Sequence, residues 1–148
     1  MRLAIEWVPF LQYSHKGPKV FLSRLADSIR RQKLCRVRSP LTPDYDIALF
    51  AYNDKSLFQK PYVIRVDGIF FDANNTVGNS DALNRTIFQG IENASGVVFV
   101  SEFSRNIVEK FYKKPSVPTT IIHNKVPIDL FTPVGENMRS RIGIPSNS

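Results

Sequence analysis

Residues 96–133 read GVVFVSEFSRNIVEKFYKKPSVPTTIIHNKVPIDLFTP, and the spacing of their apolar side chains changes twice along this stretch. The unbroken apolar run at 97–100 is typical of a strand that is buried on both faces of a parallel sheet. The pattern then becomes helical, and it returns to that of a strand over residues 119–122, which are all β-branched. Two strands joined through a helix are most simply parallel, so the stretch predicts a βαβ unit.

The helix within this unit has recognisable ends. Ser101 offers a hydroxyl that can cap backbone N–H groups, and Glu102 in the first turn complements the positive end of the helix dipole. Two lysines followed by Pro115 mark its C-terminal end. Large apolar residues recur every four positions along the helix and are predicted to share one face: Phe103, Ile107 and Phe111.

The rest of the chain shows the same alternation of strand and helix patterns. Stretches rich in apolar residues predict further strands at 3–10, 45–52 and 62–66, and residues 34–37 allow a sixth, short strand. Two more helices are predicted from their apolar stripes, which are Phe21, Leu25 and Ile29 in one and Leu83, Ile87, Ile91 and Ala94 in the other. The sequence therefore predicts an α/β fold: a single Rossmann-like, doubly wound, mostly parallel sheet with helices on both faces.

Length and composition limit the classes of function. The chain of 148 residues has room for one domain with a proper core, and its apolar content of 43% is ordinary for a globular protein. A formal charge of +7 favours an anionic partner such as a nucleic acid, a phosphorylated sugar or an acidic lipid surface. A single cysteine, Cys35, excludes an internal disulfide. No stretch reaches the roughly 20 apolar residues that span a bilayer. Glu6 and Pro9 lie in the early apolar run, which does not suit a secretory signal, so a cytoplasmic location is expected.

Polar side chains follow the predicted strands and would meet at one edge of the sheet. Parallel strands place their carboxyl ends together, and ligands of open α/β sheets bind in the crevice beyond those ends. The loop at 9–17, which precedes the first predicted helix, would lie at the same edge. The candidate residues after the other strands are Asn53, Asp67, Gly68, Ser101, Glu102, His123 and Asn124.

This candidate edge lacks the signature motifs of several enzyme classes. The sequence contains no Walker-type phosphate loop, no GxGxxG, no GxSxG and no zinc-protease helix. Its two histidines form no recognisable zinc cluster. A dinucleotide oxidoreductase and an ATP-dependent enzyme are therefore poorly supported.

The order of motifs in the C-terminal half resembles that of a known family. An apolar strand, Ser-Glu-Phe-Ser-Arg at 101–105, an amphipathic helix and Ile-Ile-His-Asn-x-Val-x-x-x-x-Phe-x-Pro at 121–133 follow one another. This order resembles the N-terminal domain of retaining glycosyltransferases with the GT-B fold, of the family 4 or glycosyl transferases group 1 type. Segments 17–19, 65–68 and 83–85 are similar to a subgroup of that family. The residues that match the family's Asn-Gly-Val-Asp-like turn and Phe-x-Pro in outline are Asn124, Val126, Asp129, Phe131 and Pro133.

The resemblance implies a hexosyltransferase-like activity with two domains. A sugar would pass from a nucleotide-sugar co-substrate to a glycan or lipid-linked acceptor, as in polysaccharide biosynthesis, with no tightly bound cofactor and no essential metal. Residues 1–133 would form the acceptor-binding domain, and residues 134–148 would be the remnant of a linker to a C-terminal donor-binding domain. This chain alone would then be inactive unless another polypeptide supplies that domain in trans.

The resemblance also implies roles for the candidate residues. Gly17 and Lys19 would approach the donor phosphates or the transferred sugar, whereas Asp67 and Glu102 would face the catalytic cleft. Asp67 would orient an acceptor hydroxyl. The other candidates are implied in donor or acceptor binding: Asn53, Gly68, Ser101, His123 and Asn124. The basic charge would hold the domain near an anionic membrane surface, where many acceptors of this family reside.

Other interpretations stay open. The basic charge admits a nucleic-acid-binding module in which Phe111 and Tyr112 stack on bases, although no known binding motif is present and the positive charges are spread along the chain. A non-catalytic remnant of a split gene is a third interpretation. Structural roles also compete for single residues, because Asp67 and Gly68 suit a turn, Ser101 suits a helix cap and His123 suits a hydrogen-bonded strand end.

Overall fold

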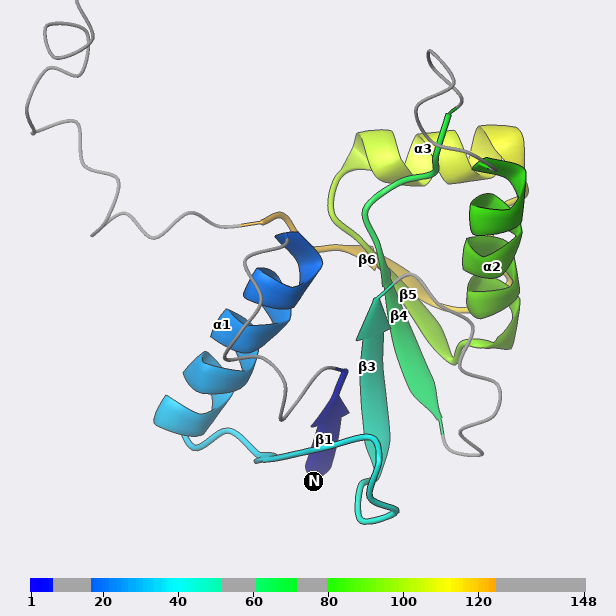
Figure 1. Ribbon diagram of the computed structural model, residues 1–148. Coiled ribbons are helices and arrows are strands. Elements are labelled where there is room, and N and C mark those ends of the chain that lie inside the picture. Colours follow the sequence, from blue (N-terminus) through cyan, green and yellow to red (C-terminus); the bar gives the residue numbers. More distant parts are fainter. Residues whose placement is uncertain (7–16, 52–60, 72–79, 125–148) are drawn as a thin grey trace, which may run out of the picture.

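The computed structural model describes residues 1–6, 17–51, 61–71 and 80–124 (Figure 1). These residues form one six-stranded sheet with helices on both of its faces. Several sequence-based predictions lie outside the described residues: Asn53, most of the loop at 9–17, the turn at 125–133 and the linker at 134–148.

All six strands of the sheet run parallel. The strands lie in the order β2-β1-β3-β4-β5-β6, and each neighbouring pair is parallel. Their bounds are β1 (Arg2–Ile5), β2 (Arg36–Arg38), β3 (Ile47–Ala51), β4 (Tyr62–Val66), β5 (Gly96–Phe99) and β6 (Thr119–Ile121). The predicted fold class is confirmed, and the sixth strand that residues 34–37 allowed is present as the edge strand β2.

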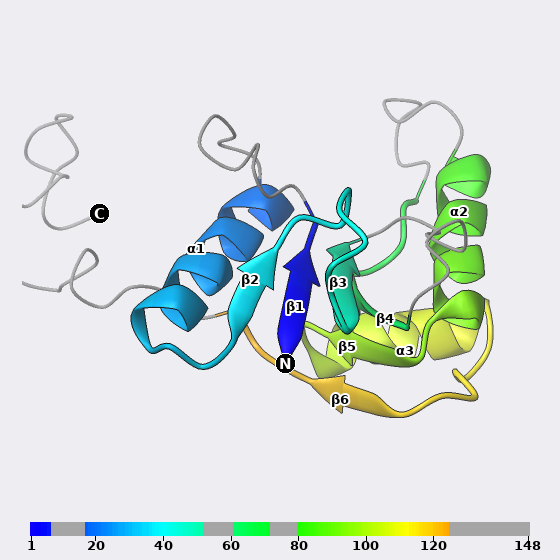
Figure 2. The ribbon, with the colours of Figure 1, turned by 90° about the horizontal axis from the view of Figure 1, so that it is seen from below.

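Helices cover the two faces of the sheet separately. Helix α1 (Gly17–Arg31) packs on the face to which Ile5 and Ala51 point, whereas α2 (Ser80–Asn93) and α3 (Glu102–Phe111) pack on the face of Ala48 and Phe50. Neighbouring residues of a strand point to opposite faces, so the central strands β1 and β3 contribute to both cores. The sheet is therefore doubly wound, as the alternation of patterns predicted (Figures 1 and 2). No helix in the described part of the chain is long and apolar enough to cross a membrane.

The buried stripe of α1 is displaced by one position from the predicted one. Leu22 and Ala26 are fully buried and Ile29 nearly so, whereas Phe21 and Leu25 are only partly buried at the margin of the same cluster. Both stripes have helical spacing, so the sequence pattern does not decide between them. The smaller residue, Ala26, lies against the sheet because it lets the helix approach closely.

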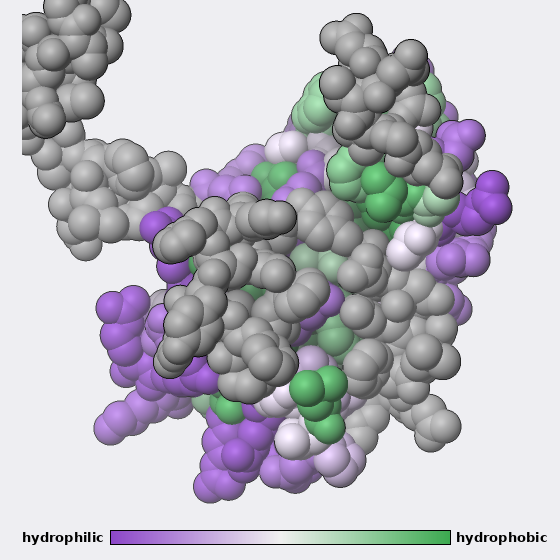
Figure 3. All heavy atoms as spheres, viewed as in Figure 1, coloured by the Kyte–Doolittle hydropathy of each residue, from purple (hydrophilic) through white to green (hydrophobic). Residues whose placement is uncertain are grey.

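Helix α3 differs from its prediction in the face that it buries. Ser104 and Val108 are fully buried, while Phe103 is 73% and Phe111 54% exposed. Phe111 instead contacts Phe71 edge-on, with ring centroids 5.4 Å apart. Apolar surface is visible in Figure 3 near the end of the molecule where α2 and α3 meet. The buried stripe of α3 is hard to recognise in the sequence because Ser104 is polar. Its hydroxyl can be buried because it forms hydrogen bonds within the first turn of the helix.

Candidate functional site

The strand order places the topological switch point of the sheet between β1 and β3. The chain leaves β1 through α1 to β2 on one side, and then returns to β3 on the other side of β1 (Figure 2). In open α/β folds the connections diverge to opposite faces of the sheet at such a reversal, and ligands commonly bind outside the carboxyl ends of the two strands. Helix α1 also begins at this edge (Figure 1).

Glu6 lies at this switch point, directly after β1. It is 4% exposed, and its Oε2 accepts a hydrogen bond of 2.6 Å from the backbone N–H of Ala51 at the end of β3. The backbone N–H of Glu6 donates to the carbonyl of Leu49 at 3.0 Å. A buried carboxylate thus joins the two strands on either side of the switch point.

Arg65 of β4 is the centre of a second polar group, which we call the Arg65 cluster and which contains Arg65, Asp67 and Asn124. Arg65 is 2% exposed. Its Nη2 donates to Asn124 Oδ1 at 2.9 Å, and its Nη1 lies 2.7 Å from Asp67 Oδ1, an ion pair that is not aligned as a hydrogen bond. The guanidinium also lies over the ring of Phe21 from α1, 4.1 Å from its centroid. Side chains that follow β4 and β6 are therefore held by one buried cation.

Asp67 and Gly68 carry the chain away from β4 at this edge. The Asp67 side chain is 28% exposed, so the carboxylate held by Arg65 also reaches solvent. Gly68 has a φ of +156°, and no atom lies within 4 Å of the position that a Cβ would occupy. The backbone conformation, and not crowding, therefore favours glycine at this position.

Ser101 acts as the predicted cap of α3. Its Oγ accepts from the backbone N–H of Ser104 at 3.1 Å, while Ser104 Oγ accepts from the backbone N–H of Ser101 at 3.2 Å. These two bonds form a capping box. Glu102 is mainly solvent-exposed, and its carboxylate lies 3.8 Å from Arg105 Nη2 on the same helix. Glu102 therefore makes no contact with the Arg65 cluster.

His123 and Asn124 follow β6 at the same edge. The ring Nδ1 of His123 lies 3.1 Å from the carbonyl oxygen of Val100, at the end of β5. This is the strand-end contact that the structural interpretation of His123 predicted. The residue is exposed, and its second ring nitrogen makes no hydrogen bond to another residue of the described ranges. Asn124, in contrast, is part of the Arg65 cluster.

The structure brings together only part of the predicted site. Asp67, Gly68 and Asn124 meet around Arg65, with His123 and Ser101 following the neighbouring strands. Gly17 begins α1 at the same edge, whereas the side chain of Lys19 is not among the described parts.

Sequence reasoning missed Glu6 and Arg65, which fix the geometry of this edge. Each is a charged residue within an apolar strand segment, LAIE for Glu6 and YVIRV for Arg65. A buried charge is costly without partners, so a charge in a strand with two buried faces is itself a signal of a polar cluster. Within the described residues, no three His, Cys, Asp or Glu side chains are grouped so that they could hold a metal ion.

Neither a protein-family model nor a curated protein matches the sequence. The glycosyltransferase resemblance therefore depends on the quoted motifs alone and stays a prediction.

Proposed function

We propose that this chain is the acceptor-binding domain of a glycosyltransferase and that it binds the hydroxyl groups of a sugar at the carboxyl edge of its sheet. The observation that supports the proposal is the Arg65 cluster, in which a buried guanidinium holds Asp67 and Asn124 at the carboxyl edge of an all-parallel sheet. A nucleotide-sugar donor would be held by a second domain that faces this edge.

The fixed position of Asp67 supports a role in orienting a hydroxyl. Arg65 and Asn124 come from β4 and from the end of β6, so their contacts restrain the cluster from two strands. Asp67 keeps part of its carboxylate in solvent, where it can accept a hydrogen bond from a bound hydroxyl. A group held in place before binding positions its substrate at a lower entropic cost.

The charge of the cluster favours a neutral ligand. The positive charge of Arg65 is opposed at 2.7 Å by that of Asp67, so the pair presents little net charge to the edge. A sugar hydroxyl needs donors and acceptors, and the partners that the edge offers are the Asp67 carboxylate, the Asn124 amide and the imidazole of His123. A phosphate would be favoured by an unopposed cation, and the Arg65 cluster offers none. This supports acceptor binding by this domain over donor binding.

Isothermal titration of the chain with saccharides and with nucleotide sugars tests the proposal. We expect weak binding of acceptor-like oligosaccharides, which the Asp67→Asn variant loses, because that change removes the acceptor charge. Glu109→Gln on α3 is the matched control, since it removes one carboxylate charge away from the Arg65 cluster, and it should leave binding unchanged. Micromolar binding of a nucleotide sugar, ordinary for a complete enzyme, would contradict acceptor-only recognition.

A further inference from the structure

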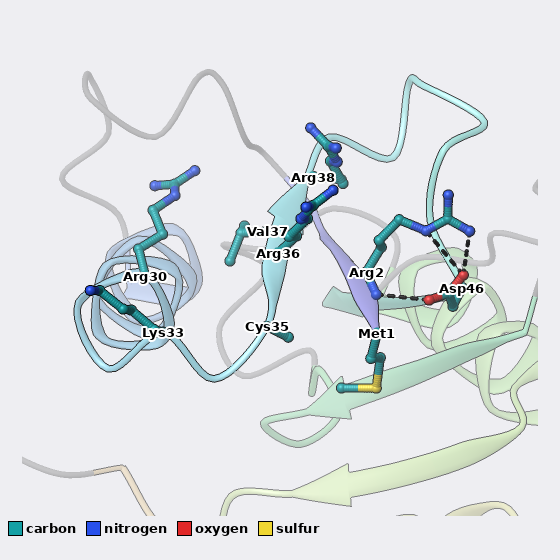
Figure 4. Close-up of a pocket in the computed structure, with 9 residues that line it drawn as sticks. All are labelled: Met1, Arg2, Arg30, Lys33, Cys35, Arg36, Val37, Arg38 and Asp46. Carbon is teal, nitrogen blue, oxygen red and sulfur yellow. Dashed lines mark hydrogen bonds and ion pairs between the residues drawn. The ribbon is translucent and has the colours of Figure 1, made fainter.

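A second concave site lies at the opposite, amino-terminal edge of the sheet. It is a groove of about 850 Å³ between the end of α1, the edge strand β2 and the start of β1 (Figure 4). Five cationic side chains and one carboxylate line it, and we call it the basic groove: Arg2, Arg30, Lys33, Arg36, Arg38 and Asp46. The groove lies away from the Arg65 cluster because parallel strands put their amino and carboxyl ends on opposite edges.

The topology explains why these cations stay near solvent. Val37 of β2 packs toward the α1 cluster, so its neighbours Arg36 and Arg38 point to the other face of the sheet. Helices α2 and α3 contact that face at β4 and β5 and do not reach β2 (Figure 2). Charged residues on an edge strand can also prevent other chains from pairing with that strand. That role does not explain why cations from α1 line the same groove.

Acidic residues neutralise only part of the groove. Asp46 is occupied by Arg2, whose backbone N, Nε and Nη2 donate to it at 2.8, 3.2 and 2.7 Å. Asp44 contacts Arg2 and lies 3.3 Å from Arg38 Nη2. Lys33 and Arg36 make no ion pair within the described residues, so their positive charges are unopposed there.

The backbone of Lys33 adds an independent observation. It follows α1 with a φ of +54°, and the bonds from Lys33 N to the Arg30 carbonyl and from Leu34 N to the Ile29 carbonyl close the helix. Glycine is the least strained residue in this helix-ending position. A lysine there carries a conformational cost and places an unopposed cation at the groove.

We propose that the basic groove binds a phosphate-bearing ligand, either a soluble diphosphate or the phosphate of a lipid headgroup. Lys33 follows α1 and Arg36 lies on β2, so the two unopposed cations that line the groove come from different elements. Guanidinium groups bind phosphate through two parallel hydrogen bonds, and lysine adds a point charge. This site is independent of the proposed sugar-binding edge.

The test compares two double variants that lose the same charge. Lys33→Gln with Arg36→Gln removes the unopposed cations of the groove, whereas Arg24→Gln with Lys114→Gln removes two exposed cations elsewhere. Binding of inorganic pyrophosphate is measured by calorimetry, and binding to phosphatidylcholine vesicles with and without phosphatidic acid by sedimentation. We expect the groove variant to lose about tenfold or more in affinity and the control to keep it, because one charge-assisted hydrogen bond is worth about a factor of ten.

The two probes separate the sources of phosphate. If the parent chain binds pyrophosphate and the groove variant does not, the ligand is a soluble phosphate. If vesicle binding requires both phosphatidic acid and the groove cations, the ligand is a lipid headgroup. The proposal would be overturned if the chain bound neither probe, or if the control variant lost as much affinity as the groove variant. It would also be overturned if the chain bound only a single-stranded oligonucleotide. Lys33→Gly separates binding from folding, since it should fold at least as stably as the parent and still bind phosphate more weakly.

Discussion

At the scale of residues, Arg65 carries a positive charge that is buried and therefore depends on its contacts. A buried guanidinium is stable only while its partners remain, and these are Asp67, Asn124 and the ring of Phe21. Removing one partner of a buried ion pair costs several kcal/mol because the other charge stays buried. The buried charge of Arg65 therefore limits which substitutions the protein tolerates at Asp67.

We expect Asp67→Asn to lower the free energy of unfolding by about 1–3 kcal/mol. The value is below the full cost of a broken buried pair because the Asp67 side chain is 28% exposed and Asn124 still accepts from Arg65. Urea unfolding at neutral pH measures it. A change within about 0.5 kcal/mol of the parent would show that Arg65 does not depend on this carboxylate.

Gly68→Ala tests backbone strain without crowding. The φ of +156° disfavours any side chain, and no atom lies within 4 Å of the added Cβ, so we expect a loss of about 1–2 kcal/mol from conformation alone. Gly96→Ala is the control. Its Cβ would meet Pro118 O at 3.5 Å and Val63 Cγ2 at 3.8 Å, which are ordinary contacts, so its stability should change much less. Equal losses in both variants, again by urea unfolding, would refute this explanation.

Protonation of Asp46 should lower the free energy of unfolding in acid. Hydrogen bonds from Arg2 hold the pKa of Asp46 below its usual value. Its contribution to stability is therefore complete above the unfolded-chain pKa of about 3.9 and is lost as the pH falls through the lower, folded-state pKa. We expect Asp46→Asn to be less stable than the parent at neutral pH and to lose less on acidification. Urea midpoints at pH 7 and near pH 2 give the comparison, and parallel pH profiles would contradict it.

At the scale of elements, α3 shows which sequence signals are ambiguous. Phe103, Ile107 and Phe111 form the more obvious apolar stripe, yet the helix buries Ser104 and Val108. We predict that Val108→Ala costs about 1.5–3 kcal/mol, because it leaves a cavity at a fully buried position. Phe103→Ala, the larger truncation, should change stability by less than about 0.5 kcal/mol, because its side chain is 73% exposed. Thermal or urea unfolding that ranks the two variants in the opposite order would contradict this assignment of faces.

The existence of the elements was predictable, and so was most of the buried stripe at α2, where Ile87, Ile91 and Ala94 are buried as predicted; the buried faces of α1 and α3 were not. Apolar runs and β-branched residues identified the strands, including the short β2, because a doubly covered parallel sheet requires such runs. The helix stripes were less certain because Leu22 and Phe21, or Val108 and Ile107, satisfy the same periodicity one residue apart. Only packing against the sheet decides between them.

At the scale of the whole molecule, the strand order decides where a ligand can bind. The sequence predicted that Asp67 and Asn124 share an edge, but it did not predict that β1 lies between β2 and β3. The place of Glu6 at the switch point depends on that order, so Glu6 was missed although its charge interrupts an apolar strand. The near-neutral Arg65 cluster and the basic groove then lie at opposite edges of one sheet, where they can serve different ligands.

The central claim is that the carboxyl edge binds sugar hydroxyls through Asp67. The most direct measurement is an NMR titration of the isotope-labelled chain with acceptor-like oligosaccharides, following each backbone amide. We predict shifts at Asp67, Gly68 and Asn124 that disappear in the Asp67→Asn variant, with no change at Lys33 and Arg36. Saccharide shifts confined to other surfaces, or the same shifts in the Asp67→Asn variant, would contradict the claim.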